Sequence, residues 1–176
     1  TANIRKEITW HDMSIGATAD YSTNTSKILR QSVITDYQYN SFFVSANLAF
    51  NLIKNIRLTE NCRWAISQSK SGNYTNMIRN FSNEAALSIA FIPDRLILNT
   101  NLQYTHNSGF TDKKDYTFMN LSITFKTKKK IQFVLNVDNV FNTKTFIYRS
   151  NSNLSESYTL YQLRPRSVML TTHFAL

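Results

Sequence analysis

Glycine, proline and cysteine are scarce in this chain of 176 residues, which has three glycines, two prolines and one cysteine. The lone Cys62 cannot form a disulfide within the chain, so cysteine usage leaves the redox compartment open. Three glycines are too few for a glycine-rich phosphate-binding loop. No apolar run approaches the roughly 18 residues of a membrane-spanning helix. The polar start, Thr1 to Lys6, is unlike a signal peptide, so an exported protein would be represented here by a mature form or a fragment.

Acidic residues are also few, with 11 Asp and Glu against 20 Lys and Arg, a net charge of +9. A basic balance can indicate nucleic-acid binding. Here, however, the basic residues gather where turns and loops are expected, at Lys113, Lys114, Lys126, Lys128, Lys129, Lys130, Arg164 and Arg166. We therefore expect no nucleic-acid partner, and basic side chains that meet solvent or lipid headgroups.

Strand-forming residues are abundant, and apolar and polar residues alternate with a period of two. At the end of the chain, for example, Val168 and Leu170 alternate with Met169 and Thr171. Trp10 falls out of phase with the segment that follows it, which indicates a bulge or a later strand start. The sequence predicts an all-β, antiparallel, up-and-down sheet of about eight strands, over residues 13–21, 42–50, 56–66, 85–91, 96–104, 119–125, 131–137 and 168–174.

The joins between these segments alternate in length along the chain. Long polar joins are expected at 22–31, 67–76 and 105–115, and short ones near 53–55, 93–94 and 127–129. A meander with its short turns at one end and its long loops at the other is typical of outer-membrane β-barrels. Soluble up-and-down barrels share the pattern, so join length alone does not decide between them.

The chemistry of the two strand faces favours a barrel in a membrane. One face is bulky and apolar, whereas the other is mostly Asn, Ser, Thr and Ala with few charges. Aromatic residues fall at both ends of the expected strands, as do the girdles of transmembrane barrels at the two lipid–water interfaces. We expect lipid-facing side chains at Leu48, Ile89, Leu121, Leu135 and Leu170, and lumen-facing ones at Asn47, Ser88, Ser122, Asn136 and Thr171.

Charged and amide side chains in phase with the polar face are the candidate site residues. A charge facing lipid near mid-membrane would cost roughly 2–4 kcal/mol for Arg, so these residues are expected to face a lumen. The lumen-facing candidates are Asn47, Arg57, Arg63, Glu84, Asn99, Asn136 and Asp138. Arg164 and Arg166 lie just outside the last apolar band, where they are candidates for binding anionic lipopolysaccharide phosphate.

The closing stretch resembles a known family. Segment 136–146 reads NVDNVFNTKTF and segment 163–176 reads LRPRSVMLTTHFAL. They resemble the last strands of TonB-dependent receptors and related large outer-membrane barrels of Bacteroides-type bacteria. The matching residues are Asn139, Phe141, Asn142, Arg164, Pro165, Arg166 and Phe174. Phe174 is third from last here, whereas the common outer-membrane signature ends on the aromatic residue itself.

The resemblance implies a barrel of about 22 strands with a plug domain in its lumen, located in the bacterial outer membrane. This chain, 1–176, would then be a single C-terminal barrel segment that forms lumen wall for TonB-dependent uptake. The implied partners are outer-membrane lipid and lipopolysaccharide, the remaining strands, the plug, an energy-coupling protein and a surface lipoprotein.

The small side chains of the polar face indicate part of a large barrel rather than a complete small one. A closed eight-stranded barrel fills its interior with side chains. Rows such as Ser45, Asn47, Ala49 and Ala86, Ser88, Ala90 would leave it underfilled. We therefore expect that the segment does not close on itself, and that segments 13–21 and 168–174 do not pair.

Residue spacing gives no sign of catalysis, a cofactor or a metal site. His11, His106 and His173 lack metal-ligand spacing, and Cys62 is expected to be a buried, inert thiol. His106, Ser108 and Asp112 are the only candidates for an enzyme at the barrel rim. A complete eight-stranded structural barrel, a rim enzyme and a soluble lipocalin-like binder remain the alternatives.

Overall fold

The computed structural model describes residues 2–10, 12–30, 32–109, 114–128, 131–151 and 156–174. Strands make up most of this part of the chain, and no helix occurs in it. The strands are β1 (Ala2–Trp10), β2 (Met13–Arg30), β3 (Val33–Ile53), β4 (Ile56–Ser71), β5 (Tyr74–Ile92), β6 (Leu96–Asn107), β7 (Asp115–Lys126), β8 (Ile131–Asp138), β9 (Thr145–Asn151), β10 (Glu156–Gln162) and β11 (Ser167–Phe174).

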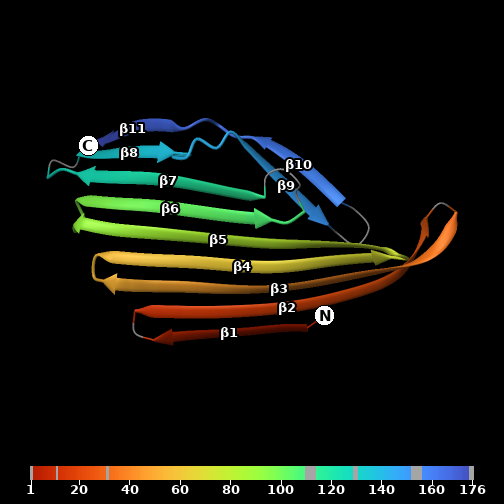
Figure 1. Ribbon diagram of the computed structural model, residues 1–176. Coiled ribbons are helices and arrows are strands. Elements are labelled where there is room, and N and C mark those ends of the chain that lie inside the picture. The colour runs from red at the N-terminus through yellow and green to blue at the C-terminus, as the bar shows by residue number, and fades with distance from the viewer. Residues whose placement is uncertain are drawn as a thin grey trace.

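Nine of these strands form one antiparallel sheet in the order β1-β2-β3-β4-β5-β6-β7-β8-β11 (Figure 1). The all-β antiparallel fold is thus confirmed. The eight expected segments lie in β2 to β8 and β11, whereas β1 and the separate hairpin β9–β10 were not expected. Trp10 ends β1 and pairs with Met13 across a tight turn, which explains why the two residues are out of phase.

Two of the expected long loops are strands instead. Residues 22–30 and 67–71 continue β2 and β4, and the chain reverses in tight turns near Ser32 and at Gly72, both with positive φ. Polar side chains pair across the β2–β3 ribbon, where the hydroxyls of Ser22 and Ser41 are 3.0 Å apart. Backbone pairing needs no apolar face, so a polar composition did not end these strands.

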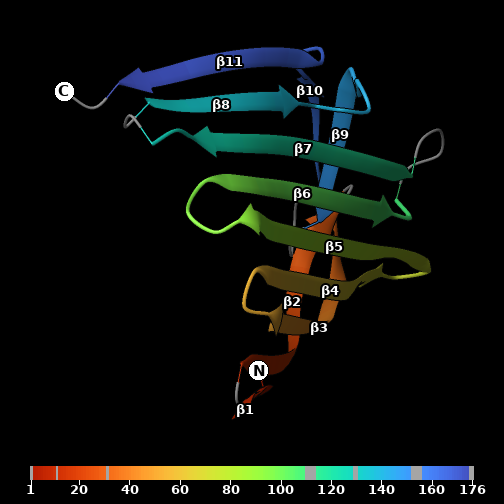
Figure 2. The same cartoon turned by 90° about the vertical axis from the view of Figure 1, so that its left-hand side faces the viewer.

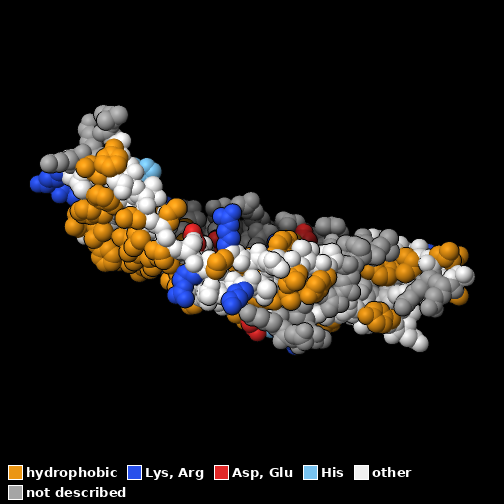
Figure 3. All heavy atoms as spheres, turned by 90° about the horizontal axis from the view of Figure 1, so that it is seen from above, with side chains coloured by type: hydrophobic (Ala, Val, Ile, Leu, Met, Phe, Trp, Pro, Cys, Tyr) orange, Lys and Arg blue, Asp and Glu red, His pale blue; other side chains and the backbone are white. Residues whose placement is uncertain are grey.

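Near the short-turn end of the sheet, strand register keeps the apolar and polar side chains on opposite faces. One row of paired residues crosses seven strands and is entirely aliphatic: Ile53, Ile56, Ile89, Leu98, Ile123, Leu135 and Leu170. The adjacent row on the other face is almost entirely polar: Asn51, Arg57, Ser88, Asn99, Ser122, Asn136 and Met169. Figure 3 shows hydrophobic side chains gathered on one side of the sheet, near its short-turn end.

The sheet is open. Strand β1 pairs with β2 alone and β11 pairs with β8 alone, so the two edges do not meet within the described residues. Segments 13–21 and 168–174 likewise have other partners, β1 and β3 for the first and β8 for the second. The prediction that this segment does not close on itself is confirmed.

The hairpin β9–β10 leaves the sheet between β8 and β11 and runs at an angle to its strands (Figure 2). Phe146 of β9 packs edge-on against Tyr116 and Phe118 of β7, with ring centroids 5.0 and 5.6 Å apart. Tyr161 of β10 stacks on the same ring at 6.0 Å. Tyr116 is 2% exposed and, with Ile78, forms the fully buried apolar core of the described residues. Both lie in phase with the polar face, so the hairpin covers that face near the long-loop end of the sheet.

Candidate functional site: the polar face and its rim

The seven lumen-facing candidates all lie on the polar face. Cross-strand pairs place Asn47 beside Asn61 and then Glu84, and Arg57 beside Ser88 and then Asn99. A hollow of about 350 Å³ is lined by four of the seven, which are Arg57, Asn99, Asn136 and Asp138. A second hollow, of about 520 Å³, is lined by the other three, which are Asn47, Arg63 and Glu84. Whether this face borders a lumen stays a prediction.

Short side chains create the hollows. The first contains Ala86, Ser88, Asn101 and Ser122 among its walls, and none of these reaches far from the backbone. Gly16 has no side chain, and the Asn47 side chain occupies the space where a Cβ at position 16 would lie. The sequence did not single out Gly16, although an isolated glycine in a strand often marks such a close approach.

The charged residues of the polar face are held by neutral partners. Glu84 accepts a hydrogen bond from the Asn101 amide at 2.9 Å, and Asp138 accepts one from the Ser167 hydroxyl at 3.3 Å. The Arg63 guanidinium lies 4.6 Å from the centre of the Phe43 ring, in cation–π geometry. Within the described part of the chain, no salt bridge joins these side chains to one another. Their charges are therefore available to a solute or a partner.

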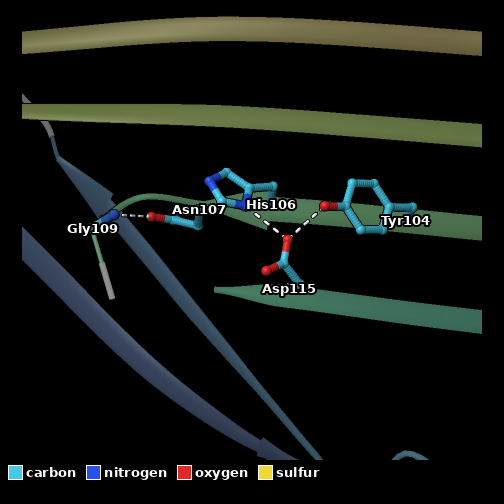
Figure 4. Close-up of polar contacts among 5 residues, drawn as sticks. All are labelled: Tyr104, His106, Asn107, Gly109 and Asp115. Carbon is cyan, nitrogen blue, oxygen red and sulfur yellow. Dashed lines mark hydrogen bonds and ion pairs between the residues drawn. The ribbon is translucent and has the colours of Figure 1, made fainter. Parts of the chain in front are cut away.

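A separate polar cluster lies at the long-loop end, in phase with the apolar face (Figure 4). One carboxylate oxygen of Asp115 accepts a hydrogen bond from the Tyr104 hydroxyl at 2.5 Å and lies 2.7 Å from Nδ1 of His106. Asp115 and His106 are 57% and 35% exposed. All three lie beyond Leu102 and Met119, where the aliphatic part of β6 and β7 ends. We call this group the rim cluster.

Hydrogen bonding shifts two ionisable groups of the rim cluster. The Tyr104 hydroxyl, and next the His106 ring, hold the pKa of Asp115 below its ordinary value. The same Tyr104–Asp115 hydrogen bond raises the pKa of Tyr104. The cluster therefore favours an ionised Asp115 beside a neutral Tyr104.

The candidate rim-enzyme residues are not brought together in the described chain. The Ser108 hydroxyl accepts the backbone N–H of Arg79 at 2.8 Å, and the Ser108 N–H donates to the Arg79 carbonyl at 2.9 Å. These bonds hold the β6–β7 connection beside β5, while Gly109 donates to the Asn107 side chain (Figure 4). His106 lies beside Asp115 instead of Ser108, and Asp112 lies outside the described residues.

The asparagines of the closing motif build the junction from which the hairpin leaves. Asn139 and Asn142 have positive φ, a conformation that asparagine tolerates better than most residues. The Asn139 side chain bonds both the N–H and the carbonyl of Thr143, and it also reaches the carbonyl of Arg164 at 2.8 Å. Asn142 accepts the backbone N–H of Arg166 at 3.0 Å. The side chains of Arg164 and Arg166 are exposed, and their binding to lipid headgroups stays a prediction.

Cys62 is half-buried rather than buried, and it belongs to a small polar group on the apolar face. The Asn83 amide donates to Glu60 at 2.8 Å, and its nitrogen lies 2.8 Å from the Cys62 sulfur. Cross-strand pairing of Cys62 with Asn83 leaves the thiol beside an amide instead of enclosed by aliphatic side chains. His173 is exposed on the polar face, and His11 lies outside the described residues.

Among the described residues, no three His, Cys, Asp or Glu side chains gather as they would to hold a metal ion. The described chain also lacks any helix of the length and apolarity needed to cross a membrane. No protein-family model, curated protein or solved structure matches this chain.

Proposed function

We propose that this chain is the C-terminal part of the wall of an outer-membrane β-barrel, a receptor or transporter of the TonB-dependent kind that encloses a lumen for solute uptake. The observation that carries the proposal is the division of the nine-stranded sheet into a mainly aliphatic face, interrupted by the group of Glu60, Cys62 and Asn83, and a polar face. The row from Ile53 to Leu170 has no charge in seven strands, whereas Arg57, Arg63, Glu84 and Asp138 all lie on the opposite face.

Lipid is the solvent that suits such an aliphatic face. Large side chains on the aliphatic face are exposed in this chain: Val168 and Leu170 are each 66% exposed, and Phe174 is 69% exposed. Apolar patches of this extent mark a membrane or a protein contact. Moving such a side chain from water into lipid is favourable, by roughly 1.5–3 kcal/mol for a fully buried Leu or Val.

Strand lengths also suit a bilayer. Strands that cross a membrane need roughly 9–11 residues, which β6 and β7, with 12 residues each, provide, whereas β8 and β11, with eight each, fall just short. The longer strands β2 to β5, with 16 to 21 residues, extend past the aliphatic band at the long-loop end. Outer-membrane barrels have their longer connections on one side in the same way.

The two open edges support a larger barrel over a complete small one. An unpaired strand in lipid leaves backbone groups without partners, at several kcal/mol for each group. Strands β1 and β11 each have one free edge in the described chain. Further strands of a larger barrel would pair with both edges and would also widen the lumen that the short polar side chains underfill.

The test is a comparison of neighbouring positions on opposite faces. In the full-length protein with Cys62→Ser, single cysteines are placed at Leu135 and Asn136, spin-labelled, and measured in lipid vesicles. We expect the label at 135 to be more accessible to oxygen and the label at 136 to a water-soluble nickel chelate. Equal accessibility at the two positions, or extraction of the native protein without detergent, would overturn the membrane proposal.

A further inference from the structure

Strand β9 and the polar face border a partly open cavity of about 260 Å³. Strands β4 to β7 contribute Ala65, Asn80, Ser82, Thr105 and Tyr116 to one wall, and β9 contributes Phe146, Ile147 and Tyr148 to the other. Figures 1 and 2 show β9 running at an angle to the sheet strands near the long-loop end of the sheet. The cavity adjoins the larger of the two hollows described above, and Arg63 and Ser82 line both.

Two polar atoms in the wall of this cavity are buried and have no hydrogen-bond partner in the structure: Asn80 Oδ1 and Thr105 Oγ1. The residues are close neighbours on one face, because Asn80 pairs with Asn107 and Thr105 pairs with Ser82. An unsatisfied buried polar group is costly, so native proteins rarely keep one without a use. The carbonyl oxygen of Asn80 can only accept, so the missing partner must carry a hydroxyl or an N–H.

The charges around the cavity have one sign. Arg63 and Lys114 contribute to its lining, and no Asp or Glu does. Within the described residues Arg63 has no carboxylate partner, and its guanidinium lies over the Phe43 ring of the adjoining larger hollow, so the arginine stands at the border between that hollow and the cavity. A cationic site with an aromatic support for its arginine favours a planar anion such as a carboxylate, which a guanidinium binds through two parallel hydrogen bonds.

The remaining walls are aromatic. Tyr116, Phe146 and Tyr148 line the cavity, and the first two are fixed against each other in edge-to-face contact. A cavity of about 260 Å³ is at or below the small end of ligand pockets, which run from roughly 300 Å³. Such a volume suits a single ring that stacks against aromatic side chains.

We propose that this cavity binds a small, single-ring aromatic acid that carries at least one hydroxyl group. Its carboxylate meets Arg63, its ring meets Phe146 and Tyr116, and its hydroxyl supplies the hydrogen bond that Asn80 and Thr105 lack. The inference concerns a cavity formed within this chain, so it does not rest on the proposed uptake function.

The experiment is isothermal titration of the full-length protein in detergent with three probes. 4-Hydroxybenzoate carries all the groups, benzoate lacks the hydroxyl, and phenol lacks the carboxylate. We expect 4-hydroxybenzoate to bind at least tenfold more tightly than either of the other two. Failure to bind at millimolar concentration, or equal affinity for all three, would overturn the proposal.

Two variants assign the contacts. Arg63→Met should weaken 4-hydroxybenzoate binding about tenfold and leave phenol unchanged, while Arg95→Met, which changes an exposed arginine outside the cavity lining, should alter neither. Thr105→Val should weaken 4-hydroxybenzoate but not benzoate, and it should raise the Tm of the ligand-free protein because it removes an unpartnered hydroxyl. A Thr105→Val protein with lowered Tm and unchanged binding would show that bound water, not a ligand, partners that hydroxyl, and would sink the proposal.

Discussion

Phe146 and Tyr116 pack edge-to-face with their ring centroids 5.0 Å apart, and this contact joins the hairpin β9–β10 to the sheet. The pair connects residues 30 positions apart across the polar face. Tyr116 is among the most buried side chains of the described chain. Phe146 therefore attaches the hairpin to the sheet, and its ring also contacts Phe118 and Tyr161.

Phe146→Ala should release the hairpin while the sheet stays folded. Loss of a buried ring and its aromatic contacts costs about 3–5 kcal/mol when the ring is fully buried, and less here because Phe146 is half-buried. Limited proteolysis should show faster cleavage between residues 139 and 166 at unchanged strand content. Leu160→Ala, a truncation of a 52% exposed side chain in the same hairpin, serves as the control and should leave the cleavage rate near that of the native protein.

Leu135→Arg should impair folding into vesicles far more than Asn136→Arg. Only the first substitution adds a charge to the aliphatic row, at a cost of roughly 2–4 kcal/mol in the middle of a bilayer. The yield of heat-modifiable folded protein on gel electrophoresis measures the difference. Similar yields for the two variants would contradict the assignment of the two faces.

Gly16→Ala should destabilise the β2–β3 pair, because the new Cβ would overlap the Asn47 side chain. Overpacking of this kind costs about 1–3 kcal/mol. Asn47→Ala removes the obstacle, so the double variant should recover most of the loss. Denaturant unfolding of both single variants and the double variant gives the coupling energy, and strictly additive effects would show that the two side chains do not compete for space.

The rim cluster should respond to pH at both ends of the range. The pKa of Asp115 is lowered in the folded protein, so its contribution is present above the ordinary pKa of an aspartate and is lost as pH falls through the folded value. The raised pKa of Tyr104 acts in the opposite sense, and its contribution is lost as pH rises through that folded pKa. In NMR titrations of the carboxyl carbon, Tyr104→Phe should move the pKa of Asp115 upward. A pKa unchanged by this substitution would exclude the hydrogen bond as its main cause.

Asn139→Ala should be more harmful than Asn139→Gly. Both remove the side-chain bonds to Thr143 and Arg164, but alanine also has to adopt a positive φ, which costs about 1–2 kcal/mol more. Unfolding free energies of the two variants should differ by about that amount. Equal values would show that the backbone at Asn139 relaxes without strain.

The period-two alternation was sufficient to place the face residues, because register in a sheet is strongly specified wherever one face is apolar. Leu135 and Asn136 were assigned to opposite faces from the sequence alone, and the pairing of β8 with β11 agrees. The strand expected at 131–137 is β8, which ends at Asp138, because Asn139 and Asn142 then turn the chain out of the sheet. The motif was visible in the sequence, but the positive φ of its asparagines was not.

The cavity beneath β9 could not be predicted in the same way. It depends on the contact of Phe146 with Tyr116, which no local pattern encodes. Asn80 and Thr105 read as ordinary members of a polar strand face, and only the hairpin laid over that face buries their oxygens. The sequence predicted the rim cluster only in part. His106 was a candidate rim residue, whereas Asp115 was expected at the end of a loop and not in a strand beside it.

The length of the β2–β3 ribbon has a mechanical consequence. Residues 33–41 lie beyond Phe42 and, at about 3.3 Å per residue, extend roughly 30 Å, which is about the thickness of a bilayer core. All 18 residues of β2 pair with β3, and β3 pairs in turn with β4 from Tyr37 onward. A load applied at the turn near Ser32, along the strand axis, pulls both arms of the ribbon in the same direction, so it is shared in shear by the backbone hydrogen bonds that join β2 to β1 and β3 to β4. The ribbon can transmit a pull from its tip into the sheet without unzipping one pair at a time.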